Sequence, residues 1–313
     1  MQRSAVVGAV VALLGVPAAA QEPVIFAEGA ISTGEYESHP AFTPDGRTLY
    51  FCKSTPDFSF WTIVVSRLED GKWTQPETAP FSGQYADADP FITADGEQLY
   101  FISNRPGPTA VEANLDIWVM DQTGDGWSEP RNLGAPINSP ANEWFPTLTT
   151  DGTIYFGSER PGGRGRCDIY SARLVNGRYE TAENLGEAIN TQFSEFEPLI
   201  SPDESYLIFA AVGRPDGKGQ FDLFVSYRRD GVWTKAVNLG EKVNTPATEF
   251  SPARSADGKR LMFTSTRGFA DKPSPKRLAY PEFSNRINEP RNGLGDIYEI
   301  DLSALNLESR RML

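Results

Sequence analysis

The chain has 313 residues, with 29 lysine and arginine residues against 42 aspartate and glutamate residues, and a formal net charge of −13. A surface this acidic argues against nucleic acid or anionic lipid as partners and is compatible with cations, basic peptides or neutral sugars. The single histidine, His39, excludes a multi-histidine metal site and leaves little room for a histidine-based catalytic triad.

The first twenty residues have the features of a secretory signal peptide. Arg3 precedes an apolar run from Ala5 to Val16, and small residues follow as far as Ala20. The apolar run is too short to span a bilayer. We therefore expect cleavage after Ala20, a single mature domain at residues 21–313, a periplasmic or secreted location and no membrane span.

A repeat of a little over fifty residues fills the mature chain. An Asp-Gly turn recurs from Asp45 onward at intervals of 50, 56, 52 and 54 residues, with Asp203-Glu204 standing in once. Eight residues before each turn aspartate lies an acid, and a proline follows three residues after each acid. The five acids, which we call the acid ring, are Glu37, Asp87, Glu143, Glu195 and Glu249. Five matches to one template indicate a repeat architecture.

Each repeat predicts four strands and almost nothing else. The first strand follows the acid, and the second follows the turn as an aromatic-rich segment such as 49–51 or 99–101. A third strand opens with aspartate in four repeats, as at Asp168-Ile169-Tyr170, and a fourth starts at an aromatic residue such as Trp127. No segment shows a convincing helical period.

Four-stranded repeats in radial array are typical of β-propellers. The fifth repeat ends at residues 298–302 without a fourth strand, whereas residues 23–28 form an unassigned strand at the start of the mature chain. We therefore predict an all-β protein, a propeller of five four-stranded blades closed by the N-terminal strand. Six blades would result if residues 269–292 contained a degenerate unit, but we interpret that stretch as a long loop in the fifth blade.

Three segments carry a resemblance to a known family. Asn-Glu-x-x-Pro at Asn142 to Pro146, the segment 158–163 and the third-strand start at 168–170 resemble the WD-like β-propeller repeat of the TolB type. The resemblance covers nearly the whole mature chain. It implies an extracytoplasmic propeller that binds proteins or envelope components, and it implies no reaction.

The two cysteines are expected to remain unpaired. Cys52 and Cys167 occupy non-equivalent positions in the first and third repeats. Blades two apart would hold them too far from each other for a disulfide. We predict two buried free thiols.

The acid ring suggests two roles. Equivalent positions in a propeller form a ring, so these carboxylates could line the mouth of the central channel and bind a peptide, sugar hydroxyls or Ca²⁺, which is the one cofactor that we consider. The favoured interpretation is structural, with each acid paired to an arginine of its own or an adjacent blade. The arginines proposed as countercharge are Arg105, Arg160, Arg214 and Arg267.

The first repeat departs from this pattern. It has Thr55 in place of the arginine, which makes Glu37 the acid expected to lack a countercharge. Two residues on, His39 occupies the position held in the other repeats by Asp89, Phe145, Glu197 and Ser251. We therefore look for a ligand or partner site at the channel mouth around Glu37 and His39.

Two functional hypotheses follow. The first is a non-catalytic, monomeric scaffold that recognises a protein or peptide of the cell envelope, because near-equivalent acids in every blade argue against the asymmetric pair that catalysis needs. The alternative is a carbohydrate-active hydrolase or lyase that uses carboxylates in the channel.

Overall fold

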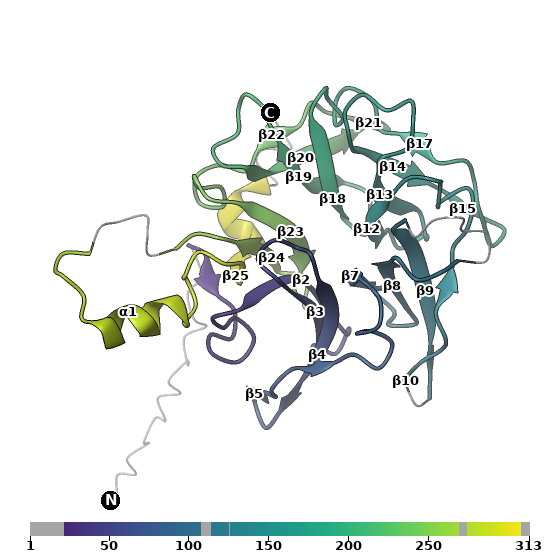
Figure 1. The fold of residues 1–313 in the computed structure, drawn as a ribbon. Coiled ribbons are helices and arrows are strands. Elements are labelled where there is room, and N and C mark those ends of the chain that lie inside the picture. The colour runs from purple at the N-terminus through teal and green to yellow at the C-terminus, as the bar shows by residue number, and fades with distance from the viewer. Residues whose placement is uncertain (1–21, 108–113, 125, 269–273, 308–313) are drawn as a thin grey trace, which may run out of the picture.

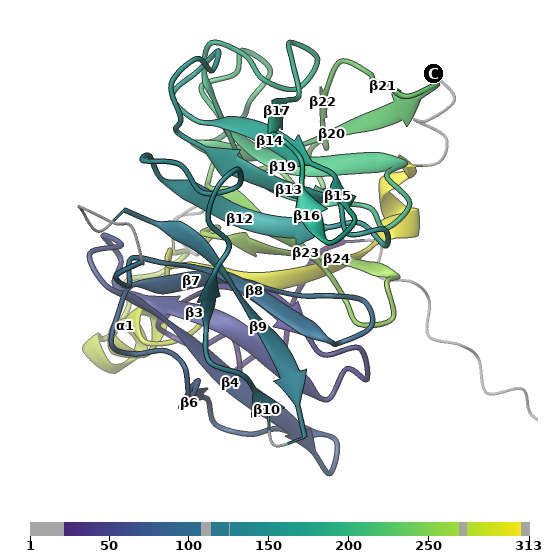
Figure 2. The same cartoon turned by 90° about the vertical axis from the view of Figure 1, so that its right-hand side faces the viewer.

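The computed structural model describes residues 22–107, 114–124, 126–268 and 274–307, so the predicted signal peptide lies outside the described residues. Five small antiparallel sheets are arranged in a ring, which confirms the five-bladed propeller (Figure 1). Figure 2 shows β7, β8 and β9 of the second blade side by side.

In the first four blades the strands follow one another in sequence from the channel outward. The first blade contains β2 (Tyr36–Phe42), β3 (Thr48–Ser54), β4 (Trp61–Glu69), β5 (Lys72–Trp73) and β6 (Glu77–Thr78). The second contains β7 (Asp87–Ile92), β8 (Gln98–Ser103), β9 (Asp116–Thr123), β10 (Gly126–Trp127) and β11 (Arg131–Asn132). The third contains β12 (Glu143–Leu148), β13 (Ile154–Ser158), β14 (Asp168–Ala172) and β17 (Glu183–Asn184), beside a hairpin of β15 (Leu174–Val175) and β16 (Arg178–Tyr179). The fourth contains β18 (Ser194–Ile200), β19 (Tyr206–Val212), β20 (Phe221–Arg229), β21 (Val232–Trp233) and β22 (Val237–Asn238).

The fifth blade is closed by the beginning of the described chain. Its sheet has the order β1-β25-β24-β23, in which β23 (Glu249–Arg254), β24 (Arg260–Ser265) and β25 (Asp296–Asp301) come from the last repeat. The fourth strand is β1 (Val24–Ile25), which pairs antiparallel with β25. This is the closure that the sequence predicts.

Helical structure appears in one place where the sequence analysis expected only loop. The segment between β24 and β25 contains the helix α1 (Tyr280–Ile287), and a 3-10 helix, η2 (Leu302–Leu305), follows β25. Pro281 lies in the first turn of α1, where a missing backbone N–H costs nothing. Among residues 274–292 no strand is present, so the described part of this insertion adds no sixth blade.

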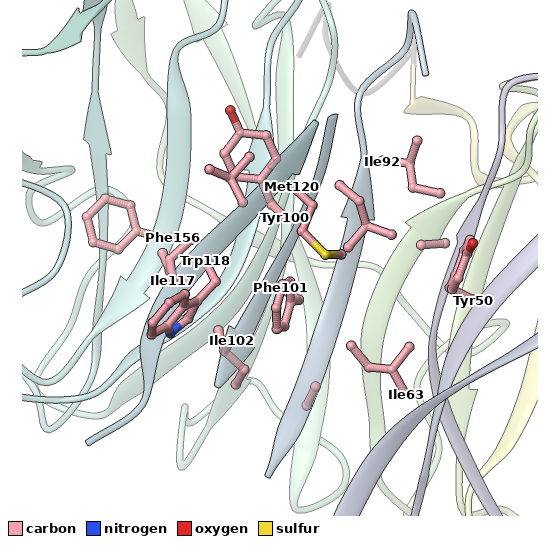
Figure 3. Packing of buried hydrophobic residues seen from close by; sticks show 14 of the residues in the cluster. Tyr50, Ile63, Ile92, Tyr100, Phe101, Ile102, Ile117, Trp118, Met120 and Phe156 are labelled. Atoms are coloured by element: carbon pink, nitrogen blue, oxygen red, sulfur yellow. The ribbon is translucent and has the colours of Figure 1, made fainter. Parts of the chain in front are cut away.

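The blades are held together by apolar side chains that interleave between neighbouring sheets. The largest cluster spans the first three blades, and Figure 3 shows Tyr50 and Ile63 of the first blade, Phe101 of the second and Phe156 of the third within it. Both cysteines are buried free thiols, as predicted. Within the described segments, no helix is long and apolar enough to cross a bilayer.

Candidate functional site

Every innermost strand bends at the same repeat position. Between β2 and β3, for example, the pairing register shifts between Ser38 and Ala41, and the corresponding shift recurs in the other four blades. One residue at each bulge has a left-handed backbone, with φ between 42° and 55°. We call these residues the bulge set: His39, Asp89, Phe145, Glu197 and Ser251. Backbone strain of this kind persists where surrounding structure enforces it, and it gathers at functional sites.

Three members of the bulge set are in direct contact. His39 Nε2 lies 3.1 Å from Asp89 Oδ1 and 3.2 Å from Glu197 Oε1. The other ring nitrogen, Nδ1, lies 2.7 Å from the hydroxyl oxygen of Ser38. The imidazole therefore joins carboxylates from two different blades.

Backbone donors hold both carboxylates in place. The backbone N–H of Phe145 donates to Asp89 Oδ2 at 2.9 Å, and that of Ser251 donates to Glu197 Oε2 at 2.6 Å. The side chains of His39 and Asp89 are 9% and 5% exposed, and that of Glu197 is 14% exposed. All five members of the bulge set thus take part in, or stand beside, one network at the channel axis.

This network lies at the base of a cavity of about 300 Å³. Residues from all five innermost strands contribute to its walls, together with residues of β3, β4, β8 and β20 and Phe58 from the loop between β3 and β4. Seven of the lining side chains are aromatic: Tyr36, Phe58, Trp61, Trp144, Phe196, Phe221 and Phe250. A concave apolar site with a few converging polar groups is the usual form of a small-molecule site.

Burial and mutual charge perturb the ionisation of this network. Burial raises the pKa of Asp89 to about 6, although the neighbouring His39 charge acts in the opposite direction. For His39, burial lowers the pKa, but the charge of Asp89 and the hydrogen bonds that the imidazole makes with the side chains of Cys52 and Glu197 outweigh it and hold the pKa well above its usual value. Perturbed groups that converge in a cleft are candidates for a functional site.

The acid ring has a different environment. All five of its side chains are fully buried. Glu143 is typical, because it accepts hydrogen bonds from the Ser139 backbone N–H at 2.9 Å, the Ser139 hydroxyl at 2.6 Å and the Ser158 hydroxyl at 2.8 Å. None of the five lines the cavity.

Arginines stand beside four of the ring acids. The shortest nitrogen–oxygen distances are 2.8 Å for Arg105 to Asp87, 3.3 Å for Arg160 to Glu143, 3.6 Å for Arg214 to Glu195 and 3.4 Å for Arg267 to Glu249. Each of these four arginines also lies over aromatic rings of its own blade. The countercharge expected from the repeat is therefore in position at these acids.

Glu37 corrects one expectation. Although its repeat lacks the arginine, Lys53 Nζ lies 3.1 Å from Glu37 Oε1, and Thr33 donates to the same carboxylate through its backbone N–H and its hydroxyl. Glu37 is therefore paired, and it is fully buried. The sequence did not indicate Lys53 because no other repeat has a lysine at that position.

His39 is the one candidate site residue from the sequence analysis that lines the cavity. Its partners Asp89 and Glu197 were noted only as occupants of the equivalent position. The signal that could have identified them is this position itself, where five repeats carry five different residues. In the part of the chain that the structure describes, no group of three or more His, Cys, Asp and Glu side chains has the arrangement of a metal site.

Comparison with known proteins finds solved structures of similar fold. A thermostable family-43 glycoside hydrolase superposes with a TM-score of 0.53 at 11% identity, covering 88% of this chain and 92% of the other. An endo-arabinase from Bacteroides thetaiotaomicron superposes with a TM-score of 0.52 at 13% identity, covering 87% and 96%. Neither a protein-family model nor a curated protein matches this chain. At this identity the likeness establishes the fold.

These neighbours correct the main functional expectation. The repeat symmetry led us to expect a non-catalytic scaffold, but the two structures that superpose on most of this chain are described as a family-43 glycoside hydrolase and an endo-arabinase. The error has a physical reason. The argument from symmetry considered the acid ring, whereas the asymmetric carboxylates occur two residues further along each innermost strand.

Proposed function

We propose that this protein hydrolyses glycosidic bonds in the aromatic cavity, with Asp89 and Glu197 as its catalytic carboxyl groups. The observation that carries the proposal is the pair itself, two carboxylates from different blades that converge on one imidazole at the base of a cavity. The whole-chain likeness to propeller glycoside hydrolases supports this choice of reaction.

The spacing of the pair suits the chemistry. Two oxygens at 3.1 and 3.2 Å from one nitrogen can lie no more than about 6 Å apart. This limit admits the spacing of about 5 to 5.5 Å between the two carboxyl groups of retaining glycosidases and excludes the wider spacing of inverting ones. The aromatic walls offer flat apolar surfaces against which a sugar ring can stack.

The two carboxyl groups differ in environment, as acid and base must. Asp89 is the more deeply buried, and its pKa of about 6 allows it to keep a proton in weakly acidic solution. We assign it as the general acid that protonates the leaving oxygen. Glu197 is the more exposed of the two, with 14% of its side chain accessible against 5% for Asp89. We assign it as the group that attacks the anomeric carbon.

His39 is a positioning residue in this scheme. It donates toward the carboxylates through Nε2 and fixes the distance between them. Its charge also limits the repulsion between two buried acids, which would otherwise be substantial in a poorly solvated cavity.

The test is an assay of the mature protein, residues 21–313, against a panel of aryl glycosides of neutral and amino sugars. We expect wild-type turnover with at least one glycoside, and a loss of about 100-fold or more in kcat for Asp89→Asn and for Glu197→Gln. The matched control is Asp216→Asn, an exposed acid on the loop between β19 and β20. Turnover that survives both amide substitutions would refute the assignment.

Three further expectations from the sequence remain proposals in addition to glycoside hydrolysis. They are the TolB-type character of the repeat, a location outside the cytoplasm and monomeric behaviour. A five-bladed enzyme with this cavity is compatible with all three, and each can be tested separately from catalysis.

A further inference from the structure

Aromatic side chains make up much of the cavity wall. Its aromatic rings form a connected wall rather than isolated platforms. Phe250 lies with its ring centroid 6.4 Å from Tyr36, 6.4 Å from Phe58 and 6.3 Å from Phe221, and 5.8 Å from the imidazole of His39.

The base of the cavity is short of positive charge. Among the described residues that line it, the charged side chains are Asp89, Glu197 and His39. With His39 protonated and Asp89 ionised, as it is above its pKa of about 6, two carboxylates face one cation. The arginines that neutralise the acid ring do not line the cavity. The acid ring is therefore neutralised by its arginines, whereas the carboxylates of the cavity are not, and a buried charge without a partner is costly.

The remaining polar groups of the wall do not supply the missing charge. Tyr36 and Cys52 remain neutral, because burial raises the pKa of the Tyr36 hydroxyl and of the Cys52 thiol. A small metal ion would require several oxygen ligands in its first shell. The cavity instead offers a cluster of aromatic rings, and such rings attract a cation with apolar substituents.

We propose that the cavity binds an organic cation, held by the aromatic wall around Phe250 and by the excess negative charge of Asp89 and Glu197. This inference deepens the proposed function and, for the choice of substrate, depends on it. As a glycoside hydrolase, the protein would act on a glycoside that carries a protonated amino group, such as an amino sugar, in preference to a neutral or acidic one.

Binding can be tested without any sugar. Calorimetric titration with choline is compared with titration by 3,3-dimethylbutan-1-ol, which has the same shape and no charge. We expect choline to bind at least about tenfold more tightly, within the range of cation–aromatic attraction reinforced by a buried charge. Equal affinity for the two compounds, or no saturable binding of choline, would overturn the inference.

Two variants locate the effect. In Glu197→Gln the cavity loses one negative charge and keeps its shape, so the preference for choline over the neutral isostere is expected to fall severalfold. Asp216→Asn removes an acid of the same face outside the cavity and is expected to leave the preference unchanged. A preference that is unchanged in Glu197→Gln would place the cation elsewhere and overturn the proposal.

The sugar experiment separates this inference from the proposed function. Turnover of glucosaminides above that of the matching glucosides supports both. Turnover of neutral glycosides without choline binding would overturn the organic-cation inference and leave glycoside hydrolysis standing. Choline binding with no turnover of any glycoside would refute the proposed hydrolysis and retain the cation site.

Discussion

The acid ring and the bulge set are separated by two residues along each innermost strand, and both recur in all five blades. At the acid-ring position every blade carries Asp or Glu, and each side chain is buried with hydroxyl donors and a cation beside it. At the bulge position no two blades carry the same residue, and the carboxylates there share one imidazole. Uniform repetition marks the side chains that build each blade, and variation at an equivalent position marks those free to acquire a function.

The largest effect that tests this contrast is on catalysis. Asp89→Asn keeps an acceptor for the Phe145 N–H but cannot donate a proton to a leaving group. We expect kcat to fall by about 100-fold or more while the melting temperature changes little. Steady-state kinetics together with thermal unfolding of the same preparation provide the check. A large loss of stability with a normal kcat would contradict a catalytic role for Asp89 and indicate a structural role for the bulge set.

The counterpart in the acid ring is an effect on stability. Glu249→Ala would leave Arg267, the Thr245 N–H and hydroxyl, and the Ser265 hydroxyl without their shared acceptor. Breaking a buried pair in this way costs about 3 kcal/mol in free energy of unfolding. Denaturant titration should show this loss, and the remaining folded protein should keep its kcat. A cost below about 1 kcal/mol would contradict a structural role for the ring.

The pH dependence of activity should reflect the bulge set. Because the pKa of Asp89 is raised to about 6, its acid form is present below that pH and is lost above it. We therefore expect kcat/KM to decline as pH rises through about 6. The same shift favours the folded state at low pH, since the folded protein holds this proton more tightly than the unfolded chain, and that contribution disappears as pH rises from about 4 to 6. A flat rate profile between pH 5 and 8 would exclude Asp89 as the acid.

The smallest effect concerns the blade that lacks the arginine. Lys53→Met removes the cation beside Glu37 but leaves both Thr33 donors in place, and the lysine side chain is itself 20% exposed. We expect a destabilisation of about 1 kcal/mol, well below that of Glu249→Ala. Comparing the denaturation midpoints of the two variants tests whether arginine in the other blades contributes more than charge alone.

Much of the architecture could be predicted because the repeat determines it. The regular spacing of Asp45 and its equivalents gives the number of blades, and the missing fourth strand after residue 302 requires the strand at the other end of the chain. The helix α1 escaped prediction because it is eight residues long and none of its residues is buried. Its apolar residues Tyr280, Phe283 and Ile287 do have helical spacing, but two turns are too short for that period to be distinguished from chance.

Only part of the site could be predicted from the repeat. The repeat shows that residues 39, 89 and 197 are equivalent, but equivalence alone does not show that the position turns toward the channel axis. That orientation comes from a backbone bulge with positive φ at a residue that is followed by proline, a conformation that residue types alone do not specify. The sequence analysis therefore selected the repeat position with the most uniform residues, which is the acid ring. The network lies instead at the repeat position with the most varied residues, which is the bulge set.

The pairing of β1 with β25 has a consequence for the order of events during folding. Residues near the beginning of the described chain find their partner more than 270 positions later, between Val24 and Glu299. Such a contact is the slowest kind to form, because nearly the whole chain must be in place before it can be made. All five innermost strands contribute to the cavity, so the site is assembled only when the ring closes. Incomplete chains, whatever blades they have already formed, would therefore be inactive.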